Sequence, residues 1–290
     1  ATILSSRGCP SKCTFCGNIV QARRFRPHSP EYFVGELEFL VKQYNIRHFH
    51  IVDDCFSYDL SRVEKICDLI LSKQLDITWF AFGRVDTLQD ERIIKKMKKA
   101  GCIYVLLGIE TGNQEINNIM RKGTTLEMAK RCCELLSKNN IKYLNSFMIG
   151  NDGDTEQTVI ETIEFARSLK SVITFFNILI PFPGTFIFKK YFSDYNNPAT
   201  NWNNWCAVGD DIPYEPRQTV LSKSDILRLT SYAYKRYYFN PKQILRTISF
   251  TGGNPRIFYS CLKGGIGLAR QTVSWFIKSI RYRREGESLG

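Results

Sequence analysis

The chain of 290 residues and 33.6 kDa is long enough to bury a substantial core, in one large domain or in one domain with an appendage. Hydrophobic residues make up 43% of the chain and aromatic residues 13%, which excludes a disordered chain. The sequence has no uninterrupted apolar run long enough to span a bilayer and no signal-peptide pattern.

The net charge of +12 is unevenly distributed. Residues 217–290 hold 14 Lys and Arg against 3 Asp and Glu, which gives +11 and leaves +1 for residues 1–216. A basic tail on a nearly neutral body indicates an anionic partner, such as nucleic acid, a phospholipid surface, an acidic substrate or an acidic domain. A merely solvated basic surface is the alternative.

The ten cysteines are not spaced as a disulfide framework. Three lie close together near the chain start, and Cys132 and Cys133 are adjacent. Thiolates that bind metal need a reducing compartment, so we expect a cytoplasmic protein. The chain opens on Ala1 and enters a predicted strand at once, as expected of a domain cut from a longer protein.

Taken in chain order, the apolar pattern predicts strands that alternate with helices. Strands are expected at 2–7, 48–52, 77–82, 104–110, 143–150 and 173–180. Helices are expected at 30–44, 59–70, 90–100, 126–138, 155–169, 222–238 and 265–284. Gly101 is an expected helix stop, and Ser222 with Asp225 forms an expected capping pair.

This alternation predicts an α/β fold, either an incomplete barrel or a doubly wound sheet, and periodicity alone does not choose between them. Several strands are nearly continuous apolar runs, as expected of parallel strands buried on both faces. Polar or turn-forming residues follow the strands at Cys9, Asp53, Asp54, Arg84, Glu110, Gly150, Pro183 and Gly184. Because ligands bind at the carboxyl edge of parallel sheets, these residues mark a candidate site.

Cys9, Cys13 and Cys16 have the spacing C-x-x-x-C-x-x-C. They supply three of the four ligands that a protein-bound zinc ion or [4Fe–4S] cluster usually needs. A cluster with one open iron, able to hold a small-molecule ligand, is one interpretation. A structural zinc site completed by a distant cysteine, or a chance spacing, are the alternatives.

The motif S-S-R-G-C-P-S-K-C-T-F-C and the ordered strand ends resemble the radical S-adenosylmethionine (radical SAM) enzymes, in the branch linked to a cobalamin-binding domain. The resemblance implies a partial (β/α)6 TIM-like barrel over 1–195 and a basic, mainly helical C-terminal extension over 196–290. It implies that Cys9, Cys13 and Cys16 hold a [4Fe–4S] cluster whose fourth iron is chelated by S-adenosylmethionine. The D-x-H-x-x-G signature of the cobalamin domain is absent from this chain, so cobalamin would come from an absent domain.

The resemblance also implies roles for residues at the other strand ends. Phe15 would pack against the cluster or adenine, and Asp53 and Asp54 of V-D-D-C-F would bind the methionine amino group, with helix capping or solvation as their alternative. The remaining cofactor contacts would be Glu110 in G-I-E-T-G, Gly150 in F-M-I-G-N-D-G-D-T and Pro183 in I-P-F-P-G-T.

Two of these elements leave a question open. Arg84 of R-V-D could face a carboxylate of a ligand, or pair structurally with Glu110 or Asp86. The element with Gly150 lacks the family's proline and has Asp154 in place of glutamate, and Asp154 and Thr155 are expected to cap the next helix.

The resemblance implies an enzyme that cleaves S-adenosylmethionine reductively and attacks an unactivated C–H bond, with methyl transfer or cyclisation on a small-molecule or lipid substrate. Flavodoxin or ferredoxin would be the electron donor. The alternatives are a methylthiotransferase-like enzyme that modifies RNA, and a non-enzymatic zinc-binding or degenerate barrel that acts as an interaction module.

The tail leaves two further choices open. Trp202, Trp205 and Tyr214 would either line the substrate opening or cover the barrel. In the predicted helix 265–284, apolar residues recur on one face and basic residues follow. This pattern fits packing on the barrel or on an absent domain, and it also fits peripheral membrane contact. The apolar positions are Ile266, Ala269, Val273, Phe276, Ile277 and Ile280.

Overall fold

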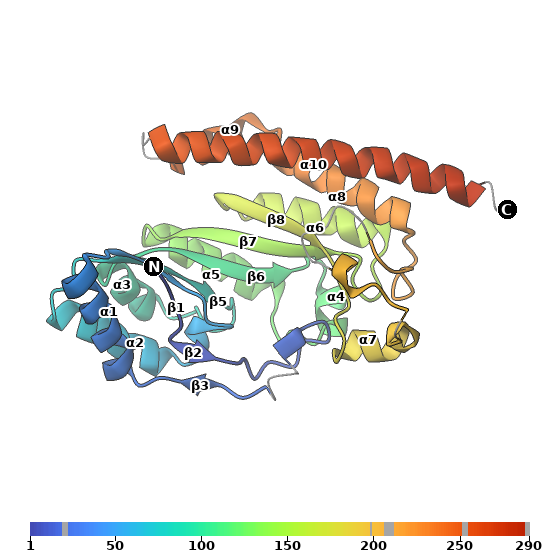
Figure 1. The fold of residues 1–290 in the computed structure, drawn as a ribbon. Helices are drawn as coiled ribbons and strands as arrows, with labels where there is room; N and C mark the ends of the chain where they lie inside the picture. Colours follow the sequence, from blue (N-terminus) through green and yellow to red (C-terminus); the bar gives the residue numbers. More distant parts are fainter. Residues whose placement is uncertain (19–22, 198, 206–211, 251–254, 288–290) are drawn as a thin grey trace. The chain divides into compact units, whose positions relative to one another are not determined.

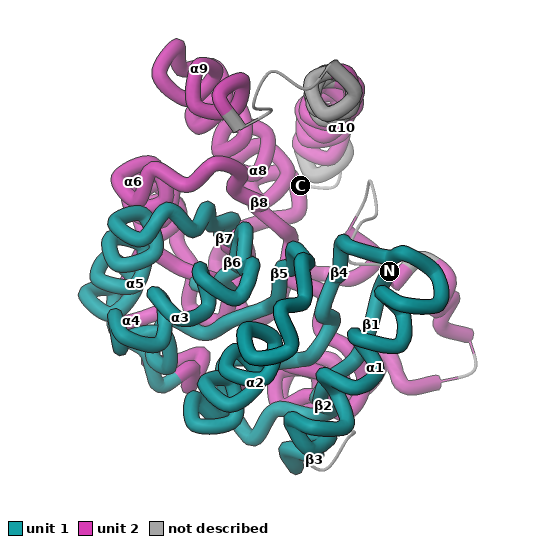
Figure 2. The backbone as a smooth tube through the Cα atoms, turned by 90° about the vertical axis from the view of Figure 1, so that its left-hand side faces the viewer, with its two compact units in different colours: residues 1–12, 18–109, 123–145 teal, residues 13–17, 110–122, 146–290 magenta. Residues whose placement is uncertain are grey.

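The computed structural model of the protein describes residues 1–18, 23–197, 199–205, 212–250 and 255–287 (Figure 1). The chain forms two compact units (Figure 2). Unit 1 comprises residues 1–12, 18–109 and 123–145, and unit 2 comprises residues 13–17, 110–122 and 146–290. The predicted domain boundary at residue 195 lies inside unit 2 and stays a prediction.

A six-stranded sheet has its strands in chain order, β1-β4-β5-β6-β7-β8. The pairs β1–β4, β4–β5 and β5–β6 are parallel. The strands are β1 (Thr2–Ile3), β4 (His48–Ile51), β5 (Thr78–Gly83), β6 (Cys102–Glu110), β7 (Lys142–Ile149) and β8 (Ile173–Ile178). This parallel sheet with a helix after almost every strand confirms the predicted α/β class.

In unit 1, helices pack side by side along the sheet in the order α1, α2, α3, α5. They are α1 (Pro30–Tyr44), α2 (Leu60–Ser72), α3 (Glu91–Lys99) and α5 (Leu126–Lys138). The end of α3 shows why the sequence stops there. Gly101 has φ +94°, and a Cβ at this position would lie 2.1 Å from the carbonyl oxygen of Ile77. Only glycine fits, so the predicted stop at Gly101 is confirmed.

Burial alternates along β5 and β6, so these strands are not buried on both faces as predicted. Trp79 and Ala81 are 1% exposed, whereas Phe80 and Phe82 are half-buried. On the half-buried face, the rings of His50 and Phe80 lie 3.7 Å apart and those of Phe80 and Tyr104 4.3 Å apart. These three rings, one from each of β4, β5 and β6, form an aromatic ladder across unit 1.

The predicted strand 2–7 is wrong in one respect, because it is split. Its second part, β2 (Ser6–Arg7), leaves the main sheet and pairs antiparallel with β3 (Arg26–Pro27). The cause lies at Ser5, whose backbone N–H donates to the carboxylate of Asp53 at 2.7 Å instead of continuing the sheet.

Unit 2 holds the rest of the sheet, α4 (Gln114–Ile119), α6 (Glu156–Ser168), α7 (Phe186–Tyr191) and the C-terminal helices. These are α8 (Lys223–Tyr238), α9 (Pro241–Phe250) and α10 (Pro255–Glu287). Ser222 and Asp225 form the predicted capping box of α8. Helix α8 packs on α6, β8 and α10. Across the described ranges, no helix combines the length and the hydrophobicity needed to cross a membrane.

Candidate functional site

The loop that leads to the first cysteine is anchored in unit 1 by Asp53. This carboxylate is fully buried and accepts hydrogen bonds from Ser5 N at 2.7 Å, Ser5 Oγ at 2.5 Å and Ser6 Oγ at 2.6 Å. The Ser5 carbonyl accepts in turn from Arg62 Nη2 at 2.7 Å. With both oxygens occupied, Asp53 holds the loop in place, and its predicted contact with the methionine amino group stays a prediction.

Asp54 is exposed and accepts a hydrogen bond from Gly8 N at 2.7 Å. One of its oxygens therefore fixes the residue before Cys9, and its exposure makes it the better placed of the two aspartates to meet a ligand ammonium. Gly8 has φ +81°, and a Cβ there would lie 2.0 Å from the carbonyl oxygen of Arg24. Only glycine allows this approach, which sets the direction of the chain into Cys9.

A hydrogen bond from Cys55 stabilises the Cys9 thiolate, and this contact together with bonds from Ser11 lowers the pKa of Cys9 to about 5. Cys55 is 1% exposed, and its own pKa is raised because it donates to Cys9 and is buried. Cys55 Sγ also lies 3.9 Å from Ser57 Oγ. Sequence reasoning missed Cys55, although the residue stands inside the quoted V-D-D-C-F element.

Ser57 extends this polar network to the end of β5. Its hydroxyl lies 2.7 Å from Thr87 Oγ1 and accepts from Arg84 N at 3.1 Å. The Arg84 guanidinium donates to both oxygens of Asp86, at 3.0 and 2.9 Å, so the structural pairing with Asp86 is the interpretation that holds. Unit 1 thus brings together the predicted strand-end residues Cys9, Asp53, Asp54 and Arg84.

The rest of the cysteine loop, residues 13–17, belongs to unit 2. Thr14 N donates to Met120 O at 3.0 Å, and Thr14 O accepts from Ile187 N at 3.2 Å. The loop between Cys13 and Cys16 is therefore held between the end of α4 and the start of α7. Phe15 is half-buried in this loop, and its contact with the cofactor stays a prediction.

Glu110 ends β6 with φ 76°, an uncommon backbone conformation for a residue with a side chain. Its carboxylate lies 3.5 Å from Lys122 Nζ, and the two side chains are only 12% and 6% exposed. The pair is therefore almost fully withdrawn from water, where each charge depends on the other for its stability. Lys122 was not singled out from the sequence, because it lies after α4 and outside the quoted G-I-E-T-G element.

The two remaining predicted cofactor contacts are turns. Gly150 has φ +86°, donates to Asp154 Oδ2 at 3.0 Å and accepts from Gln218 Nε2 at 2.7 Å. Asp154 also accepts from Asn151 N and Thr158 Oγ1, so it braces this turn. Thr155 alone caps the start of α6, which corrects the expectation that Asp154 shares that role.

Pro183 is exposed in the turn before α7. Thr185 caps α7 by accepting from Phe188 N at 3.2 Å, and its hydroxyl donates to Phe182 O at 2.7 Å. The turn is therefore rigid, and its contact with adenine stays a prediction.

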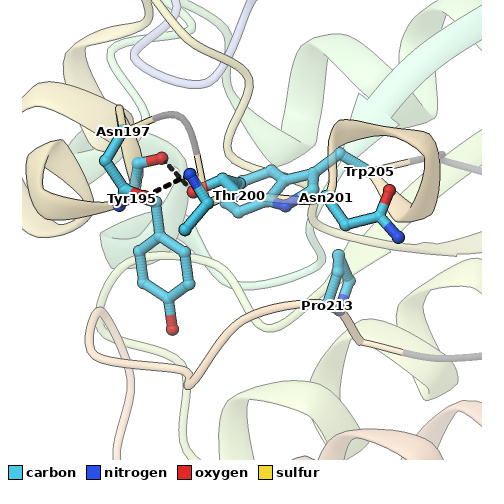
Figure 3. A pocket seen from close by; sticks show the side chains of 7 residues that line it. Tyr195, Asn197, Thr200, Asn201, Trp205 and Pro213 are labelled. Atoms are coloured by element: carbon cyan, nitrogen blue, oxygen red, sulfur yellow. Dashed lines mark hydrogen bonds between the residues drawn. The ribbon is translucent and has the colours of Figure 1, made fainter.

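The aromatic connector forms a cluster in unit 2. Trp205 is 8% exposed and lies 5.7 Å from the ring of Tyr214, whose hydroxyl donates to Leu179 O. An adjoining pocket of about 360 Å³ has Tyr195 and Asn197 on one side and Trp205 and Pro213 on the other (Figure 3). Trp205 thus both covers the core and lines a pocket, whereas Tyr214 is buried.

The donor chemistry of the loop fits an iron–sulfur cluster, because none of the three cysteines is in a disulfide and hydrogen bonds lower the pKa of Cys9, which favours the thiolate that binds iron. Within the described residues, no three Cys, His, Asp or Glu side chains lie in an arrangement that could hold a metal ion. Ligation of a cluster by Cys9, Cys13 and Cys16 therefore stays a prediction.

Comparison with known proteins identifies the family. Residues 3–166 match the Radical SAM superfamily. The chain belongs to this superfamily. Its enzymes use a [4Fe–4S] cluster and S-adenosylmethionine, so the family resemblance is confirmed.

Among curated radical SAM relatives, the chain is 31% identical over 247 residues to an uncharacterized methyltransferase of Pyrococcus horikoshii, covering 85% of this chain and 53% of that protein. It is 31% identical over 186 residues to the anaerobic magnesium-protoporphyrin IX monomethyl ester cyclase of Rubrivivax gelatinosus, covering 64% of this chain and 34% of that protein. The chain thus spans about half the length of the first relative and about a third of the second.

A solved structure shares the fold across almost the whole chain. It is the cobalamin-dependent S-adenosylmethionine radical enzyme OxsB with aqua-cobalamin and S-adenosylmethionine bound, with a TM-score of 0.63 and 15% identity. The match covers 99% of this chain and 55% of that one. This likeness confirms the partial-barrel interpretation over the doubly wound sheet.

Proposed function

We propose that this chain is the catalytic core of a radical SAM enzyme that carries out methyl transfer or cyclisation at an unactivated C–H bond of a small molecule. When bound, the cluster would supply the electron that cleaves S-adenosylmethionine, and flavodoxin or ferredoxin would reduce it. The observation that carries the proposal is the cysteine loop, which the carboxylates of Asp53 and Asp54 anchor, in a chain of this superfamily.

The residues would divide the work as follows. Cys9, Cys13 and Cys16 would ligate the cluster. Asp54, exposed beside Gly8, would accept from the ammonium of S-adenosylmethionine, and the rigid turn at Pro183 would support its adenine. Asp53 and Cys55 position Cys9 and touch no substrate in this proposal.

The choice of methyl transfer or cyclisation rests on the names of the relatives, one a methyltransferase and the other a cyclase. Cobalamin use is part of the proposal, because the structurally similar enzyme OxsB binds it. The companion domain would supply cobalamin, since none of the three histidines of this chain stands in the D-x-H-x-x-G signature. Cobalamin bound by that companion domain is then expected to be needed for methylated product, but not for cleavage of S-adenosylmethionine.

For the substrate, the aromatic ladder of His50, Phe80 and Tyr104 supports a planar conjugated ring through edge-to-face contact, because the ladder rings are stacked on one another and present their edges along the half-buried face of the strands. The Rubrivivax relative is named for a porphyrin ester. Magnesium-protoporphyrin monomethyl ester is therefore the first ligand to titrate, with Phe80→Leu expected to weaken its binding and Phe39→Leu, exposed on α1, expected to leave it unchanged.

Metal analysis separates this proposal from the zinc-binding alternative. Protein purified and reconstituted without oxygen is expected to be brown and to hold about four iron atoms per chain. One zinc ion per chain with no iron would contradict the proposal and favour a structural zinc site. The RNA-modifying alternative has only the basic tail in its favour.

A further inference from the structure

The last helix of unit 2 packs through an unexpected face. Of the residues of α10, Thr272, Trp275 and Ser279 are 4%, 5% and 6% exposed. Ser231 of α8 donates to Thr272 O at 3.1 Å, and the rings of Tyr234 and Trp275 are stacked 5.7 Å apart. The two helices run side by side (Figure 1). The helix is thus held by a face that the apolar pattern did not indicate.

A neighbouring face of α10 carries an apolar stripe that stays exposed beside α8. Val273, Phe276, Ile277 and Ile280 are 52%, 45%, 60% and 41% exposed. Their spacing of three, four and seven residues places them on one side of the helix. We call these four residues the outer stripe. Ile266 and Ala269, predicted on the same face, have side chains outside the described part.

Helix α9 repeats this arrangement. Ile244, Leu245 and Ile248 are 48%, 67% and 45% exposed. On its other side Gln243 is buried and donates to Ser171 O at 3.1 Å and to Val172 O at 2.9 Å. Two helices of one unit therefore bury polar residues, together with Trp275, and expose a row of apolar ones, unlike an ordinary surface helix.

Cationic groups adjoin the outer stripe. Lys235 Nζ of α8 lies 4.9 Å from the ring centroid of Phe276. Lys235 also lines a pocket of about 540 Å³ with Arg167 and Arg236, beside the rings of Tyr232 and Phe239. Arg167 Nε is buried there without a hydrogen-bond partner, and Phe239 is 74% exposed. Arg167 and Arg236 both pair with the carboxylate of Glu164, so the charge that the pocket offers a phosphate group comes chiefly from Lys235, beside exposed rings that suit an attached acyl chain.

We propose that the surface formed by α8, α9 and α10 docks on an anionic phospholipid membrane. The outer stripe enters the boundary between headgroups and acyl chains, and Lys235 binds lipid phosphate beside it. Basic residues beside an exposed aliphatic stripe are typical of interfacial helices. Residues 217–290 carry a charge of +11, and although Arg217, Lys223, Arg228 and Arg236 pair with acidic residues earlier in the chain, the remaining excess of positive charge complements an anionic surface. This docking is independent of the reaction proposed above.

Other occupants fit the surface less well. Nucleic acid would use the cations but not the aliphatic stripes, because it presents phosphates and bases. A protein interface is depleted in lysine at its centre, whereas Lys235 lies directly against Phe276.

The test is co-sedimentation of the whole chain with vesicles of phosphatidylcholine alone and of phosphatidylcholine with phosphatidylglycerol. We expect binding only to the anionic vesicles, weakened by salt. Phe276→Ser with Ile277→Ser is expected to lower the partition coefficient at least ten-fold, and Lys235→Gln roughly five-fold. The control, Phe39→Ser with Leu71→Ser, removes apolar side chains that are 54% and 39% exposed in unit 1, and it is expected to bind as the unchanged chain does.

Three results would overturn the proposal. They are equal binding to neutral vesicles, no binding to either kind, and anionic binding that the two substitutions in the outer stripe leave intact. Self-association that the same substitutions abolish, without vesicle binding, would assign the stripe to a second copy of the chain. Inorganic phosphate that displaces no vesicle-bound protein at millimolar concentration supports a lipid rather than a free anion as the ligand.

Discussion

The thiol of Cys55 donates a hydrogen bond to the sulfur of Cys9 inside unit 1, where Cys55 is 1% exposed. The bond joins the residue after the Asp53–Asp54 pair to the first cysteine of the triad. Residues that hydrogen-bond to a metal ligand fix the direction of that ligand. Cys55, held in the protein core, is expected to do this for the sulfur of Cys9.

Cys55→Ala removes this donor, and we expect the reconstituted chain to lose iron to a chelator about ten-fold faster. Cys55→Ser, which keeps a donor, is expected to recover most of the difference. Cys67→Ala on α2 is the matched control, because Cys67 is equally buried and lies outside the network. Equal rates of iron loss from all three variants would contradict the proposed positioning role of Cys55.

Gly8→Ala places a methyl group 2.0 Å from the carbonyl oxygen of Arg24 in a backbone conformation with φ +81°. We expect the loop to shift and reconstituted iron to fall to a small fraction, at a cost of about 2 kcal/mol in stability. Gly17→Ala, at the other end of the triad, meets nothing within 4 Å and is expected to keep its iron. Colorimetric iron analysis and urea unfolding provide the two readouts, and full iron content in Gly8→Ala would contradict the geometry.

The buried pair of Glu110 and Lys122 predicts strong coupling between two substitutions. Lys122→Met leaves a buried carboxylate without its ammonium and is expected to cost about 3 kcal/mol in the free energy of unfolding. Adding Glu110→Gln is expected to recover most of that loss, as measured by a double-mutant cycle in urea. Additive losses would mean that the two side chains act independently.

Burial raises the pKa of Asp154 to about 6, although hydrogen bonds from Asn151 N, Thr158 Oγ1 and Gly150 N oppose the shift. The native state therefore binds this proton more tightly than the unfolded chain does. Protonated Asp154 therefore contributes its whole stabilising free energy below pH ~4, the ordinary pKa range of an aspartate. This contribution is lost as the pH rises through about 6.

Asp154→Asn keeps the shape of this turn without the charge. We expect urea unfolding to show a variant that is more stable than the unchanged chain at pH 7, by on the order of 2 kcal/mol, and little different at pH 4. Asp76→Asn is the control, because the side chain of Asp76 is 98% exposed. It is expected to leave the free energy of unfolding unchanged at both pH 7 and pH 4. A variant that is less stable at pH 7 would contradict the burial argument.

Local signals in the sequence were enough to predict the strands and most helices, because the apolar runs, the helix stop at Gly101 and the helix start at Ser222 adjoin the segments that they define. The departure of β2 from the main sheet could not be predicted, since it depends on Asp53 capturing Ser5, 48 residues away in sequence. The roles of Cys55 and Lys122 depend on similar contacts.

Helix α10 shows a further limit of sequence reasoning. Periodicity located an apolar face but not the direction in which it points. The packing of α8 against Thr272 and Trp275 turns that face outward.

The central claim is that Cys9, Cys13 and Cys16 serve reductive cleavage of S-adenosylmethionine. The most direct measurement is the yield of 5′-deoxyadenosine from anaerobically reconstituted protein with reductant and S-adenosylmethionine. We expect product from the unchanged chain and from Cys132→Ala, and none above background from Cys9→Ala, Cys13→Ala or Cys16→Ala. Undiminished product from any of those three variants, or no product from an iron-loaded unchanged chain, would contradict the account.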